Sequence, residues 1–119
     1  MTTRALSTST LAGDNVENRG GETLGTVEEI MIDLESGRVA YMVLASGGFL
    51  GVGDKFFAIP WDMVEIDMDN EKVVLDIDKE TIENAPGFDK DNWPEPTDTA
   101  WLNDVYVYYG RTPYWSDDS

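Results

Sequence analysis

The sequence contains neither cysteine nor histidine. Without cysteine there is no disulfide, no thiolate metal ligand and no thiol nucleophile. Without histidine the chain lacks the most common general base and the most common transition-metal ligand. Most familiar catalytic and metal-binding constellations are therefore excluded, and the residues imply no cofactor.

Basic residues are scarce: 8 lysine and arginine residues stand against 24 acids, for a formal net charge of −16. Such a field repels nucleic acid and anionic membrane surfaces. The acids are spread along the chain, as on a well-solvated surface. The same balance is also typical of a saline environment or of a protein that meets a basic partner. We therefore expect no nucleic-acid partner.

Long apolar runs are also missing. No stretch approaches the roughly 20 apolar residues that a membrane helix needs, and residues 1–13 contain no apolar core of a signal peptide. With 41% hydrophobic and 27% charged residues, the composition is that of a globular protein. The sequence thus predicts one globular unit without membrane insertion, located by default in the cytoplasm.

Apolar and polar residues alternate through much of residues 25–77. Residues 26–33 and 64–78 have the period of two that half-buried strands show. Gly37 and the stretch 69–71 mark hairpin turns, and residues 39–45 are apolar on both faces, which predicts a central strand. One more short strand is expected in the lead before Leu24. Short strands separated by turn signals about every ten residues predict a small antiparallel barrel or sandwich.

The pattern changes after Asp78. Residues 79–85 suggest one or two helical turns, and residues 97–110 favour a helix that Thr97 or Asp98 caps and Gly110 ends. A strand is the alternative, because VYVYY is rich in β-formers. The expected apolar face of the helix comprises Trp101, Val105, Tyr108 and Tyr109. The fold class is therefore all-β to α+β, with a short helical C-terminal extension.

Several of these features form a recognisable combination: Leu24-Gly25, Asp33 with Gly37, the apolar run 39–45, the glycine turn at 47–53, and Ile59-Pro60-Trp61. With these motifs, residues 9–85 resemble the PRC-barrel family. That family is named after the cytoplasmic domain of the photosynthetic reaction centre H subunit and includes the C-terminal domain of the ribosome maturation factor RimM. The tail is similar to that of stand-alone bacterial members. The resemblance implies a small antiparallel β-barrel that often self-associates and binds other proteins, and it carries no catalytic signature.

Residues 46–61, SGGFLGVGDKFFAIPW, contain a glycine-rich loop that could be read as a phosphate cradle. The spacing fits neither a P-loop nor a dinucleotide fingerprint. Both motifs also need a following helix, whereas a strand is expected here and Asp54 would repel a phosphate. We interpret the loop as a connection between strands. Phe49 and Leu50 at its tip either fold back onto the core or form an exposed contact for a partner.

The many carboxylates allow two further hypotheses. Asp67, Asp69 and Glu71 have the spacing that opens a calcium loop, but Lys72 stands where that loop needs glycine, so no metal site is expected. A catalytic carboxylate pair needs a cleft and a carboxyl group with a raised pKa, and a small barrel offers little cleft. A carboxylate-pair hydrolase is therefore the least favoured function, and we expect no enzyme.

Aromatic side chains crowd the C-terminal part of the chain. They either pack across the barrel and cover an edge of it, or form a surface for a partner, for which tryptophan and tyrosine are favoured. Stacking with single-stranded nucleic acid would need basic residues, and this stretch offers only Arg111. The candidate partner contacts, together with Phe49 and Leu50, are Trp93, Trp101, Tyr108, Tyr109, Tyr114 and Trp115.

These observations lead to one functional hypothesis and one main alternative. The hypothesis is a non-enzymatic protein–protein interaction or assembly module, acting on a protein partner or on itself as a homodimer. The alternative is a small-ligand binding module with its pocket between the barrel and the tail. In either case we expect residues 1–85 to form the barrel-like domain and residues 86–119 an aromatic, partly helical extension packed on it.

Overall fold

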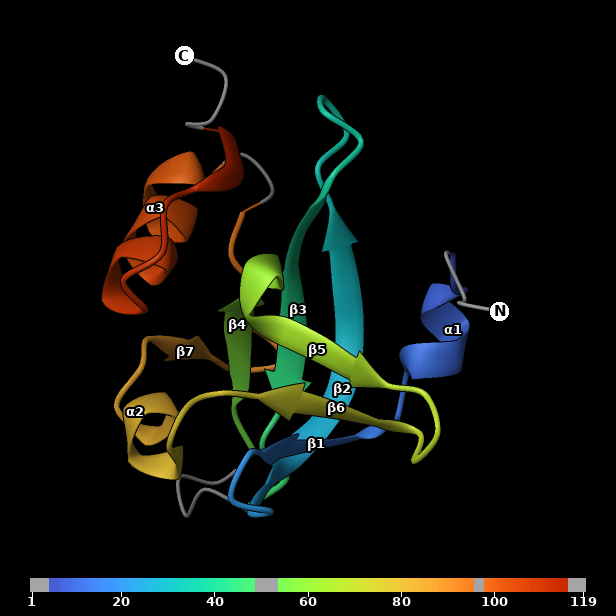
Figure 1. Cartoon of the computed structure of the whole chain (residues 1–119). Helices are drawn as coiled ribbons and strands as arrows, with labels where there is room; N and C mark the ends of the chain where they lie inside the picture. The colour runs from blue at the N-terminus through green and yellow to red at the C-terminus, as the bar shows by residue number, and fades with distance from the viewer. Residues whose placement is uncertain (1–4, 49–53, 96–97, 116–119) are drawn as a thin grey trace.

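The computed structural model describes residues 5–48, 54–95 and 98–115. Seven strands form one sheet in the order β5-β6-β1-β2-β3-β4-β7 (Figure 1). The elements along the chain are α1 Thr8–Leu11, β1 Asn15–Asn18, β2 Thr23–Ile32, β3 Val39–Ala45, β4 Phe56–Pro60, the 3-10 helix η1 Trp61–Met63, β5 Val64–Asp67, β6 Lys72–Leu75, α2 Lys79–Glu83, β7 Gly87–Phe88 and α3 Thr99–Tyr108. The class is α+β, mostly sheet with a short C-terminal helix.

The sheet is mixed and open, so the antiparallel barrel is not confirmed. Strand β1 pairs with β6 in parallel, with Val16 opposite Val73, while the other pairings are antiparallel. Within the described ranges no ladder joins the two edge strands, β5 and β7. The expectation failed at this point because alternation shows which face of a strand is buried, but not which strand lies beside it.

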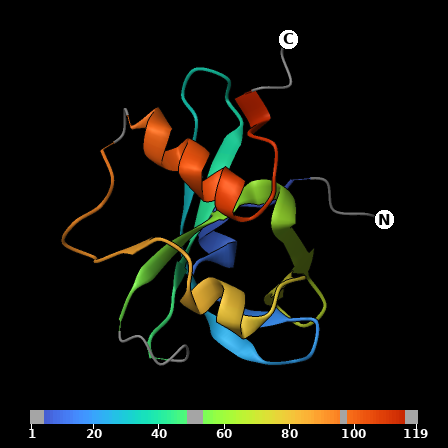
Figure 2. The ribbon, with the colours of Figure 1, turned by 90° about the vertical axis from the view of Figure 1, so that its left-hand side faces the viewer.

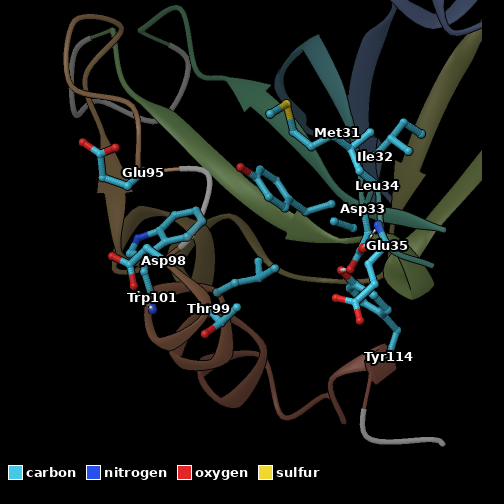
Figure 3. Close-up of a pocket in the computed structure, with 13 residues that line it drawn as sticks. Met31, Ile32, Asp33, Leu34, Glu35, Glu95, Asp98, Thr99, Trp101 and Tyr114 are labelled. Carbon is cyan, nitrogen blue, oxygen red and sulfur yellow. Dashed lines mark hydrogen bonds between the residues drawn. The ribbon is translucent and has the colours of Figure 1, made fainter. Parts of the chain in front are cut away.

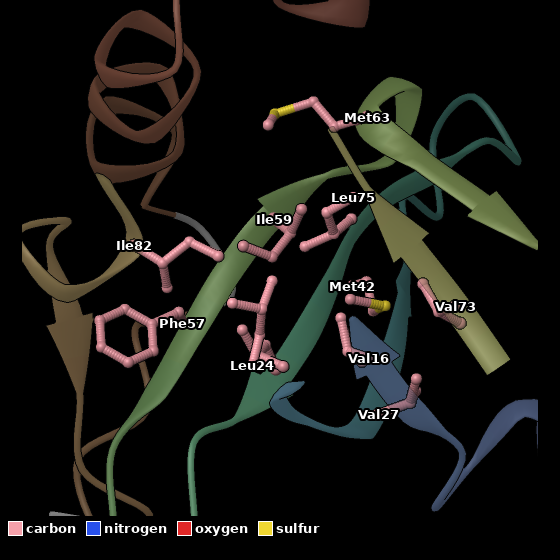
Figure 4. Close-up of a cluster of buried hydrophobic side chains, with 11 residues drawn as sticks. Val16, Leu24, Val27, Met42, Phe57, Ile59, Met63, Val73, Leu75 and Ile82 are labelled. Atoms are coloured by element: carbon pink, nitrogen blue, oxygen red, sulfur yellow. The ribbon is translucent and has the colours of Figure 1, made fainter. Parts of the chain in front are cut away.

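The sheet bends so that β5, β6 and β1 cross in front of β2, β3 and β4 (Figure 1). The main hydrophobic core lies between these two arms. It contains Val16 of β1, Val73 and Leu75 of β6, Met42 and Leu44 of β3, and Ile82 of α2, and Figure 4 shows most of these side chains converging. The half-enclosed core explains why a sheet that is not closed still buries its apolar face.

Helix α3 lies over the other face of β3 and β4 (Figure 2), and a second hydrophobic cluster packs beneath it. Tyr41 and Val43 of β3 pack there with Ala58 of β4 and Val105 of α3. Because β3 also contributes Met42 and Leu44 to the main core, it is buried on both faces. The prediction of a central strand at 39–45 is confirmed.

The predicted turns and helices are present. Gly37 has a φ of +74° in the β2–β3 hairpin, and β5 and β6 form the expected second hairpin. In α3 the Asp98 side chain accepts a hydrogen bond from the Trp101 backbone N–H at 2.9 Å. The predicted apolar face of α3 was wrong at one position: Tyr106 is buried, while 38% of Tyr108 is exposed. Which face is buried depends on how α3 packs on β3 and β4, and the helical period alone does not specify that.

The glycine-rich loop joins two paired strands, as predicted. Strands β3 and β4 are antiparallel neighbours, and the loop is closed at its base by Ser46, whose Oγ accepts from the Lys55 N–H at 3.1 Å. Gly47 and Gly48 have positive φ values of 55° and 88°. Because a strand and not a helix follows, the loop has no helix N-terminus to hold a phosphate.

Candidate functional site

A groove of about 330 Å³ runs between the β2–β3 hairpin and α3 (Figure 3). We call it the hairpin–helix groove. One bank is the hairpin, residues 32–35, and the other is the start of α3 with Glu95 and Asp98. Tyr114 lines the groove from the C-terminal segment. Three segments that are distant in sequence therefore build this surface.

The floor of the groove is apolar and aromatic. Tyr41 and Trp101 meet edge to face with ring centroids 5.7 Å apart, and Trp101 also meets Phe88 at 5.9 Å. Met31 and Leu102 line the groove beside them. These residues belong to the cluster under α3, so the floor is held rigidly by the packing of α3 on the sheet.

The hairpin bank is shaped by Asp33. Its Oδ1 accepts hydrogen bonds from the backbone N–H groups of Glu35, at 2.9 Å, and Ser36, at 3.1 Å. This arrangement, in which an aspartate side chain caps its own turn, projects Leu34 into solvent with 94% of its surface exposed. Ile32 beside it is 48% exposed. An exposed apolar pair thus lies next to the apolar floor.

Carboxylates surround the groove on both banks: Asp33 and Glu35 on the hairpin, Glu95 and Asp98 at the helix. Two of them have structural tasks, since Asp33 caps the hairpin turn and Asp98 caps α3. Neither Glu35 nor Glu95 has a side-chain hydrogen bond or ion pair within the described ranges. Among the described lining residues of the groove there is no lysine or arginine. Arg38 lies in the adjoining hollow with Glu35 and Tyr114, so the charged groups that line the groove itself are all acidic.

Tyr114 fastens the C-terminal segment to the hairpin. Its hydroxyl donates to Oδ2 of Asp33, and Arg38 Nη1 donates to the Tyr114 carbonyl at 2.9 Å. The hydrogen bond from Tyr114 is the main reason why the pKa of Asp33 is lowered. The pKa of Tyr114 is raised, first by burial and then by the bond to Asp33. We call this contact the Tyr114 clasp.

Replacing Tyr114 with phenylalanine is expected to raise the pKa of Asp33 towards the ordinary carboxyl value of about 3.9, because the main hydrogen bond to the carboxylate is lost. Since the folded-state pKa of Asp33 is lowered, the stability from this group is present above about pH 3.9 and is lost as the pH falls through the folded pKa. Asp33 is close to solvent, so we expect a loss of only about 0.5–1 kcal/mol at neutral pH.

The test is a carboxyl NMR titration of Asp33 in both proteins, with urea unfolding at neutral pH and near pH 3. The stability difference between them should shrink at the lower pH. An unchanged Asp33 pKa in the phenylalanine variant would show that the clasp does not form in solution.

The predicted contact residues fall into different places. Trp101 and Tyr114 line the groove. Trp93 lies beyond the sheet edge against Phe56 and Phe88, with 37% of its surface exposed. Phe49 and Leu50 lie outside the described residues.

The remaining three aromatic residues pack against neighbouring rings or elements. The Tyr108 hydroxyl donates to the Thr81 carbonyl at 2.6 Å, which ties α3 to α2. Tyr109 packs against both hydrophobic clusters, and burial raises its pKa. Trp115 meets the rings of Tyr106 and Tyr114, with centroid distances of 5.7 Å and 5.0 Å. These contacts hold the tail on the sheet, and of the predicted contact residues that the structure describes only Trp101 and Tyr114 line the groove.

The sequence interpretation missed the hairpin bank. The sequence pattern places Leu34 in the hairpin turn and Ile32 in a half-buried strand, and it marks neither as a contact residue. One signal was available: a leucine in the otherwise polar turn DLESGR is unusual for a solvent-facing loop. The bulge near Glu28 also shifts the register between β2 and β3, so that the simple alternation along 26–33 does not hold.

The described residues contain neither a cluster of metal ligands nor a membrane-spanning helix. No three carboxylates there converge into a metal-binding group. No helix in the same ranges has the length and hydropathy needed to cross a membrane.

A family model, the PRC-barrel domain, matches residues 4–82. Among solved structures, the chain is similar to a 16S ribosomal RNA processing protein, RimM, from Pseudomonas aeruginosa, with 19% identity and a TM-score of 0.49. The similarity covers 63% of this chain and 45% of that one, so the chain spans less than half the length of that protein. No curated protein gives a significant match. Since the family model spans more than half of the 119 residues, the chain belongs to the PRC-barrel domain family.

Proposed function

We propose that this PRC-barrel protein is a non-enzymatic interaction module that holds a partner protein in the hairpin–helix groove. The observation that carries the proposal is the exposed pair Ile32 and Leu34 beside an apolar floor. Contiguous exposed apolar surface with a polar rim is typical of protein interaction sites. Trp101 and Tyr114 supply the rigid aromatic surface that such sites favour.

The charge of the groove favours a partner of different sequence over a second copy of this chain. In a twofold dimer the same patch faces itself, so the four carboxylates would meet their own copies. Like charges brought together in an interface cost several kcal/mol. A homodimer through this groove is therefore disfavoured, while a homodimer through another surface stays a prediction from the sequence.

The carboxylates also weigh against a hydrolase. Among the described residues, the carboxyl groups with a shifted pKa are Asp33, Asp67 and Asp78, and in each the pKa is lowered, mainly by a side-chain hydrogen bond. A general acid needs the opposite shift, from burial in an apolar pocket. These three residues are therefore poor candidates for the acid of a carboxylate pair.

The first test is purification of the tagged full chain from its native cells. Replacing both Ile32 and Leu34 with serine is expected to abolish retention of the partner, because it removes the exposed apolar contact. Val107→Ser is the matched control, since Val107 is 63% exposed on α3 and does not line the groove. Equal retention by the double variant and the control would contradict the proposal. Light scattering of the pure protein measures whether it self-associates.

A small-ligand module is the second candidate, because two hollows lie between the sheet and the C-terminal segment. The groove has a volume of about 330 Å³, and a hollow on the other side of Tyr114, lined also by Trp61 and Tyr106, has about 380 Å³. Small-molecule pockets begin at about 300 Å³. A monomer that retains no partner, yet melts at a higher temperature with a metabolite, would replace the interaction module by this function.

A further inference from the structure

We infer that the occupant of the hairpin–helix groove is an extended segment of another protein that carries arginine or lysine next to a large apolar side chain. This inference rests on the proposed function and specifies the chemistry of the partner. The family match ends at residue 82, so α3 and Tyr114, which form one bank and one end of the groove, lie beyond the family domain. The groove therefore combines the hairpin of the matched domain with the segment that follows it.

The positive charge of the partner follows from the rim. Asp33 and Glu35 line the groove on the hairpin bank, and Glu95 and Asp98 line it at the start of α3 (Figure 3). Glu35 and Glu95 are exposed and have no side-chain hydrogen bond or ion pair in the part of the chain that the structure describes. A basic side chain of the partner beside either glutamate would pair with it without breaking an existing contact. The net charge of −16 would also steer such a segment towards the protein.

The floor favours a cation as well. Trp101 is partly exposed in the groove, and its ring meets Tyr41 and Phe88 edge to face. A guanidinium or ammonium group over a tryptophan ring is attracted by the negative face of the ring, and the attraction grows when the pair is desolvated. Aromatic floor and acidic rim thus select the same charge, and both reject a phosphate backbone.

The apolar part of the partner follows from the hairpin bank. Leu34 and Ile32 expose 94% and 48% of their surface immediately beside the floor. A small cation such as a polyamine would leave them in water. An adjacent leucine-like side chain on the same segment would cover them. A peptide with both features is therefore the occupant that uses the whole surface.

The experiment measures binding of short fluorescein-labelled peptides by anisotropy at about 0.15 M ionic strength. The first peptide alternates arginine and leucine, the second has serine in place of leucine, and the third has glutamate in place of arginine. We expect the arginine–leucine peptide to bind about tenfold more tightly than the arginine–serine peptide, since covering one leucine-sized side chain contributes about 1.5 kcal/mol. No binding is expected for the glutamate–leucine peptide.

Two pairs of variants separate local recognition from general attraction to an acidic protein. The double variant Glu35→Gln with Glu95→Gln is expected to bind the arginine–leucine peptide about tenfold more weakly. Glu28→Gln with Glu80→Gln removes the same charge from exposed positions outside the groove and should weaken it less than about twofold, because surface charges beyond a Debye length are screened. Leu34→Ser should reduce the affinity for the arginine–leucine peptide to the affinity that the unchanged protein has for the arginine–serine peptide. Val107→Ser should leave the affinity for the arginine–leucine peptide unchanged.

Three results would overturn the inference: equal effects of the two glutamine pairs, equal binding of the two arginine peptides, or competition by spermidine as strong as by the arginine–leucine peptide. The last result would identify a small-cation site. If no peptide binds, but the partner captured by the full chain is still lost on Ile32→Ser with Leu34→Ser, the proposed interaction module stands and only the basic partner chemistry falls. If no peptide binds and the full chain captures no partner that depends on Ile32 and Leu34, the proposed function fails together with this inference.

Discussion

Replacing Gly25 with alanine is expected to unfold the protein or to lower its free energy of unfolding by more than about 3 kcal/mol. Gly25 lies where β2 contacts both β1 and β3: it is opposite Val16, and the next residue, Thr26, is opposite Ala45. An added Cβ would lie 2.1 Å from the carbonyl oxygen of Ala45, and the φ of +153° strains any other residue. Backbone cannot move aside as a side chain does, so either β2 separates from β3 or the chain does not fold. Urea unfolding followed by circular dichroism measures the loss.

Gly37→Ala is the matched control for this prediction. Gly37 also has a positive φ, +74°, but an added Cβ would meet nothing within 4 Å. Its expected cost is therefore the backbone term alone, about 1 kcal/mol. If Gly25→Ala costs no more than Gly37→Ala, the close approach of β2 and β3 is absent in solution. The comparison also explains the Leu24-Gly25 motif physically. Leu24 is fully buried in the main core, and the missing side chain of Gly25 lets the backbone of β3 at Ala45 come close to β2.

Replacing Phe57 with alanine is expected to lower the free energy of unfolding by about 3–5 kcal/mol. Phe57 is 1% exposed and lies opposite Ile82 of α2 in the main core (Figure 4). On its other side β7 comes so close that a Cβ on Gly87 would lie 2.9 Å from Cε1 of the ring. The ring therefore joins β4, α2 and β7, and its loss leaves a cavity that three elements border. The free energy of unfolding of a native domain is about 5–15 kcal/mol in total, so little stability would remain in the variant.

Urea unfolding measures this loss, and hydrogen exchange should show that the amides of α2 become the least protected part of the core. Phe57→Leu should cost less than about half as much, because most of the volume remains. Val107→Ala, at a position 63% exposed, should change stability by less than about 0.5 kcal/mol. A small cost for Phe57→Ala would mean that α2 and β7 do not pack on β4.

Much of the local structure could be predicted because it depends on residues close together in the chain. Asp33 and Gly37 specify the hairpin turn through a side-chain cap and a positive φ. Asp98 starts α3 by accepting the Trp101 N–H. The apolar run 39–45 became a strand buried on both faces. In each case the interaction that decides the structure spans only a few residues.

The groove could not be predicted, because its parts meet only through the fold. Tyr114 and Asp33 are 81 positions apart, and Tyr106 donates to the Ala40 carbonyl across 66 positions. The sequence interpretation selected aromatic residues for a contact surface. It did not separate Trp101 and Tyr114, which line the groove, from Tyr108 and Trp115, which hold the tail in place. Which face of α3 is buried depends on how the helix crosses β3.

By itself, the sequence determined the strand-rich class, the turns, the two short helices and the absence of cysteine and histidine chemistry, because each depends on composition or on neighbouring residues. Only the tertiary structure decided that β1 lies parallel to β6, that the sheet stays open, and that four carboxylates and two exposed apolar residues surround one aromatic floor. The physical reason is the same throughout. A local sequence pattern indicates which side chains are buried. The segment that covers each of them is determined by contacts between parts of the chain that are distant in sequence.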